Sequence, residues 1–229
     1  QFSDIPKERH IAIVGGGLAG LSTAFHLLEK TKKNEPGESP PIRITILDKA
    51  PVGTAGASSV AGGLLHPFSP RGKPVHLGME GLESTNYLVS KALKHRPDCV
   101  LRDKLYRAAL SDQHLHQMQE TAANYPDHCS LMSMEDMNAK CRTETALGGL
   151  CLTSGKVIHV PSYLDGLWKA CIELSGGTAE WRMIEDNTCD EPLQQLQESK
   201  WKKGLQEFDT VVLSAGAGLI QSNIFTCHE

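Results

Sequence analysis

Residues 9–20 read RHIAIVGGGLAG, an apolar run that passes directly into a Gly-x-Gly-x-x-Gly turn. The run Arg9–Val14 is uninterrupted and partly β-branched, which predicts a short buried strand. Beyond the turn, apolar residues recur at helical spacing from Leu18 to Leu28, which predicts an amphipathic helix. Strand, glycine turn and helix in this order predict a dinucleotide-binding unit.

Each glycine of the turn has its own task in such a unit. Gly15 permits the tight turn, Gly17 lets the backbone approach a pyrophosphate, and Gly20 lets the helix pack closely on the strand. The free N–H groups at the helix start, around Leu18 and Ala19, are expected to hold the phosphates.

A second apolar strand, Ile42–Leu47, ends in Asp48, whose carboxylate can accept hydrogen bonds from ribose hydroxyls. Asp48 and the following Lys49 are therefore candidate cofactor-binding residues. The polar segment Thr31–Pro41 is expected to be an inserted surface loop, which explains why Asp48 comes later than the usual spacing of about 20 residues. An acid at this position disfavours NADP, while FAD and NAD both remain open.

A second cluster of small residues, Gly53–Gly63, follows this strand. Such a segment suits backbone lying against an extended, flat cofactor and favours a flavin. A solvated linker is the alternative, but Val60, Leu64, Leu65 and Phe68 are too apolar for one.

Together, the glycine turn, the Asp48 strand end and residues 57–64 resemble the D-amino-acid oxidase superfamily of FAD-dependent amine oxidoreductases. Gly56–Ser69 is most similar to the glycine oxidase branch and to the flavin domain of the bacterial enzyme that matures 5-methylaminomethyl-2-thiouridine in tRNA. Plant and algal relatives of that branch share the GGLLHP run. The resemblance implies FAD as cofactor. It adds candidate cofactor contacts at Ala57, Ser58, Gly62, Gly63 and Leu64, and a third contact at Ala215 and Gly216.

The implied chemistry is transfer of a hydride from the carbon next to an amine nitrogen to the flavin, followed by hydrolysis of the imine. A glycine-like primary or secondary amine is the expected substrate. No catalytic side chain is assigned. His66 could contact substrate or steer a proton, but a turn histidine bonded to backbone is the favoured interpretation.

The resemblance also implies the fold class, a Rossmann-like α/β FAD-binding domain interleaved with an incomplete antiparallel-sheet substrate domain of α+β type. The expected boundaries are residues 1–90 for the first part of the FAD-binding domain, 91–156 for a partial substrate domain, 157–219 for the return of the FAD-binding domain, and 220–229 for a tail.

Several elements are expected within these boundaries. Asp186–Lys203 is expected to be a solvated excursion. Helices are expected at Leu82–Leu93, at Asp112–Asn124 and from Pro161 to Ser175, and strands at Lys104–Leu110, Val157–Pro161 and, buried, from Phe208 to Ser214.

Relatives in the family continue past Ala215–Gly216, adding strands, an arginine for the substrate carboxylate and a last flavin-binding segment. We therefore expect the sequence to be a carboxy-terminally shortened form. The start at Gln1 leads us to expect that an amino-terminal segment is missing.

Composition and charge argue against a nucleic-acid-binding or membrane-spanning protein. The 229 residues are 40% apolar and 22% charged, with a net charge of −4 and no clustered basic footprint for nucleic acid. No apolar run approaches the roughly 20 residues of a membrane span. Nucleic acid is a partner only through the resemblance to the tRNA-modifying branch, and the oligomeric state is left open.

Cysteines and histidines predict no metal site and a reducing compartment. The seven cysteines include no Cys-x-x-Cys pair, so a disulfide framework or a zinc site is not expected. His114, His116 and His128 are expected at the surface. The predicted location is the cytoplasm, with a plastid or mitochondrion as the alternative if a transit segment is missing.

Two other functions compete with the amine oxidoreductase. An NAD-binding dehydrogenase or reductase is disfavoured by Gly53–Gly63 and by the lack of a Tyr-x-x-x-Lys pair. A noncatalytic flavin-binding remnant is the other alternative.

Overall fold

The computed structural model describes residues 8–34, 40–184, 205 and 207–217. The chain divides into two compact units. The first unit comprises residues 1–61, 91–97 and 160–229, and the second unit comprises residues 62–90 and 98–159. A parallel sheet in the first unit and antiparallel sheets in the second confirm the expected mixed α/β class.

The first unit is built on a four-stranded parallel sheet in the order β10-β1-β2-β9. Its strands are β1 (Arg9–Val14), β2 (Ile42–Asp48), β9 (Glu180–Met183) and β10 (Thr210–Leu213). Consecutive residues of β1 and β2 are buried, so both faces of the central strands are covered. This explains why these strands are continuous apolar runs rather than alternating ones.

Strand β10 is present where it was expected, but the prediction that it is buried was wrong. Val211 is 37% exposed and Leu213 is 46% exposed, because β10 forms one edge of the sheet in the part of the chain that the structure describes.

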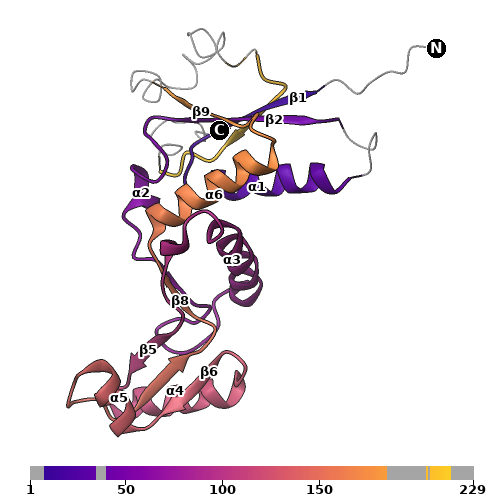
Figure 1. The fold of residues 1–229 in the computed structure, drawn as a ribbon. Helices are drawn as coiled ribbons and strands as arrows, with labels where there is room; N and C mark the ends of the chain where they lie inside the picture. Colours follow the sequence, from indigo (N-terminus) through magenta and orange to yellow (C-terminus); the bar gives the residue numbers. More distant parts are fainter. Residues whose placement is uncertain (1–7, 35–39, 185–204, 206, 218–229) are drawn as a thin grey trace, which may run out of the picture. The chain divides into compact units, whose positions relative to one another are not determined.

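Helices α1 (Leu18–Lys33) and α6 (Val160–Leu174) pack together on one face of this sheet (Figure 1). Their buried sides are the apolar stripes that the sequence predicted, with Leu21, Phe25 and Leu28 inward on α1. The short helix α2 (Gly56–Ser59) completes the unit.

The prediction that a loop begins at Thr31 was wrong, because α1 continues to Lys33. The last turn is held by an ion pair between Lys33 and Glu29, 3.1 Å apart, and by the Thr31 hydroxyl, which donates to the Leu27 carbonyl. Basic residues in this last turn also suit the negative end of the helix dipole.

The second unit contains two three-stranded antiparallel sheets. One has the order β3-β8-β4 and the other β5-β7-β6. The strands are β3 (Leu64–Leu65), β4 (Val100–Arg102), β5 (Leu105–Ala108), β6 (Cys129–Met132), β7 (Gly149–Leu152) and β8 (Lys156–Ile158). The helices are α3 (Gly78–Ala92), η1 (Pro97–Cys99), α4 (Asp112–Asn124) and α5 (Met134–Cys141).

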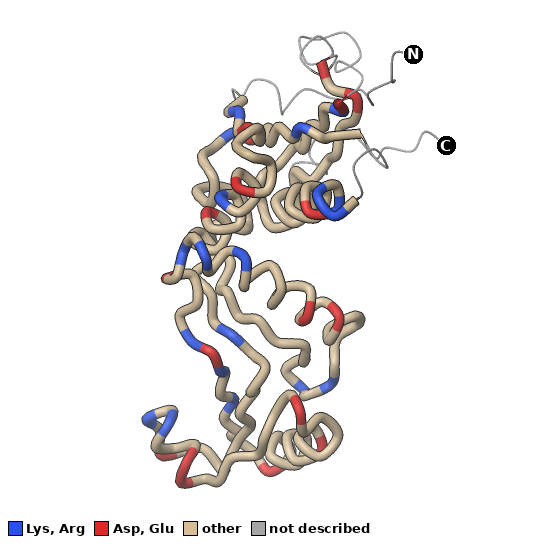
Figure 2. The backbone as a smooth tube through the Cα atoms, turned by 45° about the vertical axis from the view of Figure 1, so that its right-hand side comes forward, with Lys and Arg blue, Asp and Glu red and all other residues tan. Residues whose placement is uncertain are grey.

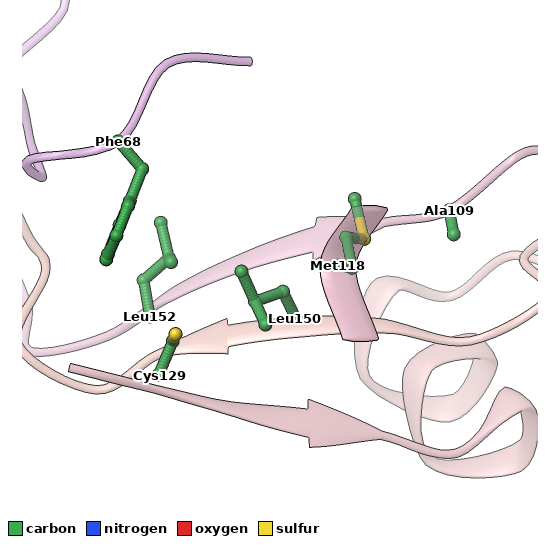
Figure 3. Close-up of a cluster of buried hydrophobic side chains, with 6 residues drawn as sticks. All are labelled: Phe68, Ala109, Met118, Cys129, Leu150 and Leu152. Atoms are coloured by element: carbon green, nitrogen blue, oxygen red, sulfur yellow. The ribbon is translucent and has the colours of Figure 1, made fainter. Parts of the chain in front are cut away.

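The core of the second unit joins distant parts of the sequence. Its buried side chains are Phe68, Ala109, Met118, Cys129, Leu150 and Leu152 (Figure 3). Phe68 also packs edge-on against Tyr125, with ring centroids 5.3 Å apart. The segment after residue 61 is therefore anchored by Phe68 in the second unit.

The compact units divide the chain differently from the expected boundaries on both sides of residue 90. Residues 91–97, expected in the partial substrate domain, fall in the first unit. Residues 62–90 were expected in the first part of the FAD-binding domain, 1–90, whereas they pack with the second unit. The return at residue 160 lies close to the expected boundary between 91–156 and 157–219. The assignment of the units to flavin and to substrate stays a prediction. The excursion Asp186–Lys203 and the tail 220–229 lie outside the described residues.

Charged residues of both signs are distributed over both units (Figure 2). His114 and His116 are exposed, and His128 is half-buried.

Among the described helices, none has the length and apolarity to cross a membrane. Within the described residues, no three His, Cys, Asp or Glu side chains gather as a metal site.

His10 of β1 is a buried imidazole held between neighbours of the first unit. Its Nε2 lies 2.9 Å from the Thr45 hydroxyl, its Nδ1 lies 2.9 Å from the Arg43 guanidinium, and its ring packs on Phe208. Burial has the largest effect on His10 and lowers its pKa. The positive charges of Arg43 and Arg182 lower this pKa further, and the negative charge of Glu207 opposes them.

We expect the free energy of unfolding to fall as the pH drops below the ordinary histidine pKa of 6.5. Below this pH, His10 of the unfolded chain binds a proton, whereas His10 of the folded chain stays neutral because its pKa is lower. Protonation therefore favours unfolding until the pH reaches the lowered pKa of the folded state. Urea unfolding of the chain at several pH values measures this. The His10→Asn variant should lose part of the pH dependence and the exposed His26→Asn should keep it. Identical slopes in all three proteins would contradict the prediction.

Candidate cofactor site

The turn between β1 and α1 is the centre of the site in the first unit. Gly15 has a φ of +97°, a conformation that strongly favours glycine, and its N–H donates to the Leu47 carbonyl at 2.8 Å. A Cβ on Gly15 would lie 2.5 Å from the Ser214 carbonyl oxygen. The first glycine therefore allows both the turn and the close approach of the chain that follows β10.

The amino terminus of α1 is open to an anion. Gly17 is its N-cap and carries no side chain, and the first turn holds no acidic residue. Among the described residues, the Ser58 hydroxyl is a side-chain partner of a first-turn amide, and it accepts from the Leu18 N–H at 3.2 Å. The Leu18 amide is engaged by Ser58, and the positive end of the helix dipole with the amides of Ala19 and Gly20 can hold a phosphate.

Helix α2 brings Ala57 and Ser58 to this helix terminus. A Cβ on Gly17 would lie 2.9 Å from the Ser58 hydroxyl oxygen, so glycine at this position leaves room for Ser58. A serine hydroxyl both donates and accepts hydrogen bonds. Ser58 can therefore donate to a phosphate oxygen and still accept from the backbone of α1.

Asp48 is fixed at the end of β2 by two backbone amides. Its Oδ2 accepts from the Gly16 N–H at 2.6 Å and its Oδ1 accepts from the Ala50 N–H at 3.1 Å. A carboxylate has about four acceptor sites, so each oxygen can still accept from a ribose hydroxyl. Lys49, the next residue, is exposed.

Ser214 ties the end of β10 to the glycine turn. Its hydroxyl lies 2.9 Å from both the Val14 and the Gly15 carbonyl oxygens, and its N–H donates to the Val14 carbonyl. Ala215 then packs on the cluster that contains Val14, and Gly216 has a φ of +59°. The structure thus brings Ala215 to the glycine turn, and Gly216 follows it directly.

Trp181 is a residue of this site that the sequence analysis missed. A Cβ on Gly16 would lie 2.0 Å from the Trp181 ring, whose Nε1 donates to the Ala50 carbonyl at 3.1 Å. The ring also packs edge-on against Trp168, with centroids 5.5 Å apart. Trp181 therefore supports the turn and the segment after Asp48 together. No sequence signal marked it, because β9 is short and Trp181 stands between charged residues.

The remaining candidates, Gly62, Gly63 and Leu64, belong to the second unit. Gly63 has a φ of +67°, and its carbonyl accepts from the Ile158 N–H at 2.9 Å, which continues the pairing of β3 with β8. Leu64 is 61% exposed and Val60 of the first unit is 83% exposed. The part played by this segment in holding a cofactor stays a prediction.

The residues of the first unit fit an adenine dinucleotide. A helix terminus without acids can take the pyrophosphate, and Asp48 can take a ribose. The first-unit candidates that the structure gathers near this turn are Gly15, Gly17, Leu18, Ala19, Gly20, Asp48, Lys49, Ala57, Ser58, Ala215 and Gly216. Their contact with a cofactor stays a prediction.

Comparison with known proteins supplies the family. The family model described as DAO, FAD dependent oxidoreductase, matches residues 10–225. A curated relative, the probable oxidoreductase OrdL of Haemophilus influenzae, is 23% identical over 212 residues, which are 83% of this chain and 47% of the relative.

Solved structures share the fold. Glycine oxidase from Geobacillus kaustophilus matches with a TM-score of 0.55 and 19% identity, over 77% of this chain and 47% of that one. L-Amino acid deaminase from Proteus myxofaciens, solved with anthranilate, matches with a TM-score of 0.59 and 13% identity, over 79% of this chain and 39% of that one. The chain thus spans about half the length of the relatives it matches.

Proposed function

Because the chain belongs to the DAO family of FAD dependent oxidoreductases, we propose that it oxidises the C–N bond of a glycine-like primary or secondary amine. The observation that carries the proposal is the first-unit site. There the terminus of α1, whose first turn contains no acidic residue, lies at one glycine turn with Asp48 and Ser214. NAD is not proposed as the cofactor, since the family is FAD dependent.

The substrate class is supported by two kinds of likeness. Residues 56–69 resemble the glycine oxidase branch and the tRNA-modifying branch, whose amine is a substituted glycine. The names of the structural neighbours, glycine oxidase and L-amino acid deaminase, also point to amino acids. A small amine is therefore the proposed partner, and an amine carried on tRNA is the alternative.

The residues of this chain would hold and orient the cofactor. The amides of Ala19 and Gly20 and the Ser58 hydroxyl, which accepts from the Leu18 N–H, would bind the pyrophosphate. Asp48 would accept from a ribose. The chemistry supplied by a bound FAD would be acceptance of a hydride from the carbon next to the amine nitrogen, and water would hydrolyse the resulting imine to a carbonyl compound and a free amine.

The first experiment is the visible spectrum of the 229-residue chain after incubation with excess FAD and desalting. We expect retained flavin bands. The loaded protein is then mixed without oxygen with glycine, with sarcosine and with an alcohol of similar size. Bleaching of the flavin by the amines alone supports the proposal. Retained flavin that no amine bleaches favours the alternative, a noncatalytic flavin-binding protein.

The compartment that we propose is the cytoplasm, with a plastid or mitochondrion as the alternative. Five described cysteines, at positions 99, 129, 141, 151 and 171, are free thiols in the structure, and a reducing compartment would keep them reduced. Cell fractionation with an antibody against the chain distinguishes the three locations.

A further inference from the structure

Arg107 in β5 is a half-buried cation that has no acidic partner in the part of the chain that the structure describes. One nitrogen of its guanidinium donates to the Ser69 carbonyl at 2.7 Å, and burial lowers the pKa of Arg107. Among the ion pairs of the described residues, none includes Arg107. Buried charges are ordinarily paired, and the remaining N–H groups of the guanidinium are free to donate to another acceptor.

His66 lies close enough to be affected by this cation. The residue follows β3, and its Nδ1 is buried with no hydrogen-bond partner among the described residues. Burial lowers the pKa of His66 first, and the positive charge of Arg107 lowers it further, against a hydrogen bond to the Phe68 backbone that raises it. The same short segment, residues 66–69, thus carries an unpartnered ring nitrogen and the carbonyl that fixes Arg107.

We propose that Arg107 and His66 together form a binding site for a carboxylate group. A carboxylate would supply the negative charge that Arg107 lacks, in a geometry that a guanidinium accepts with two N–H groups. The Nδ1 of a protonated His66 would donate to the same anion. Both residues lie in the second unit, so the site is complete within one compact body.

The carboxylate has two sources. The first is the substrate itself, and this reading rests on the proposed function, because a glycine-like amine carries a carboxylate. The second is a separate small acid that binds beside the substrate. Arg107 is not the arginine that the family resemblance places after Gly216. A carboxylate bound at Arg107, whether from the substrate or from a separate acid, is therefore compatible with that resemblance.

The test follows the pKa of His66 by NMR in the flavin-free chain, titrated with acetate at constant ionic strength. A bound carboxylate stabilises the imidazolium, so we expect acetate to raise the pKa of His66 by about one unit. Acetamide, which has the same shape and no charge, should leave it unchanged. The His66→Asn variant identifies the resonance among the ten histidines.

Two matched arginine variants test whether the response of the His66 pKa to acetate depends on Arg107. Arg107→Gln should abolish the dependence on acetate, while Arg71→Gln, an exposed arginine of the same unit, should keep it. If Arg107→Gln does not fold, the comparison of acetate with acetamide on the unaltered chain still decides. A pKa that does not respond to acetate, or responds equally to acetamide, overturns the proposal.

Sarcosine and dimethylamine separate the two sources. A rise in the His66 pKa with sarcosine but not with dimethylamine supports the substrate carboxylate. A rise with acetate and none with sarcosine supports a separate acid. Because no flavin is present, failure of this site is distinguishable from failure of FAD binding or amine oxidation.

Discussion

Replacement of Gly20 by alanine is expected to lower the free energy of unfolding by about 2–3 kcal/mol. The added Cβ would lie 1.9 Å from the Gly15 carbonyl oxygen and 2.8 Å from the Ser214 hydroxyl. The first of these atoms belongs to the backbone of the turn, so α1 must move away from β1 to make room. The same movement would carry the amides of the helix terminus away from the phosphate position.

Urea unfolding of Gly20→Ala and of the unaltered chain measures the loss, and retention of FAD after desalting measures the consequence for the site. Gly81→Ala is the matched control. Gly81 lies inside α3, and nothing lies within 4 Å of a Cβ added there. This change should stabilise the helix by up to about 1 kcal/mol. Equal effects of the two alanines would show that α1 does not pack on the turn as described.

The glycine turn could be predicted because its signals are local. The strand β1 and the start of α1 follow from apolar periodicity within a few residues of the motif, and β2 with Asp48 follows from a second such run. Backbone conformation at Gly15 and packing at Gly20 both depend on neighbours in this short stretch or on one later strand. Such local signals can be interpreted without knowing how distant segments of the chain pack.

The Trp181 contact and the hydrogen bonds of Ser214 to the turn could not be predicted, because both depend on strand pairing through the sheet. β9 pairs with β2, and β10 pairs with β1, across more than a hundred residues of sequence. Strand pairing at such distances depends on tertiary packing rather than on local propensity. Nothing near Trp181 in the sequence indicates that its ring would cover Gly16.

The segment after Asp48 shows that apolar composition alone does not decide which residues are buried. Val60, Leu64 and Phe68 are all apolar, yet Phe68 is 1% exposed and Val60 is 83% exposed. Phe68 is buried because β5, β6 and β7 with α4 offer it a core in the second unit. The sequence shows which residues can be buried, and the partner that buries them decides where the chain changes unit.

Asp48 is the residue at which a single change should weaken FAD binding most clearly. Asp48→Ala removes the acceptor for a ribose and also the one that holds the Gly16 and Ala50 amides in place. Hydrogen bonds to a charged group contribute about 1.5–3 kcal/mol, and each 1.4 kcal/mol is a factor of ten in affinity. We therefore expect the Kd for FAD to rise by about 10- to 100-fold.

Quenching of FAD fluorescence on titration with protein measures this Kd, and urea unfolding without FAD separates a loss of affinity from a loss of fold. Asp103→Ala, which removes an exposed acid from the second unit, should bind FAD as the unaltered chain does. The affinity of Asp48→Asn for FAD should lie between those of Asp48→Ala and the unaltered chain, because the amide keeps one acceptor oxygen and loses the charge. If Asp48→Ala binds FAD with unchanged affinity, the ribose does not lie at the end of β2, and the dinucleotide must be held by the helix terminus of α1 alone.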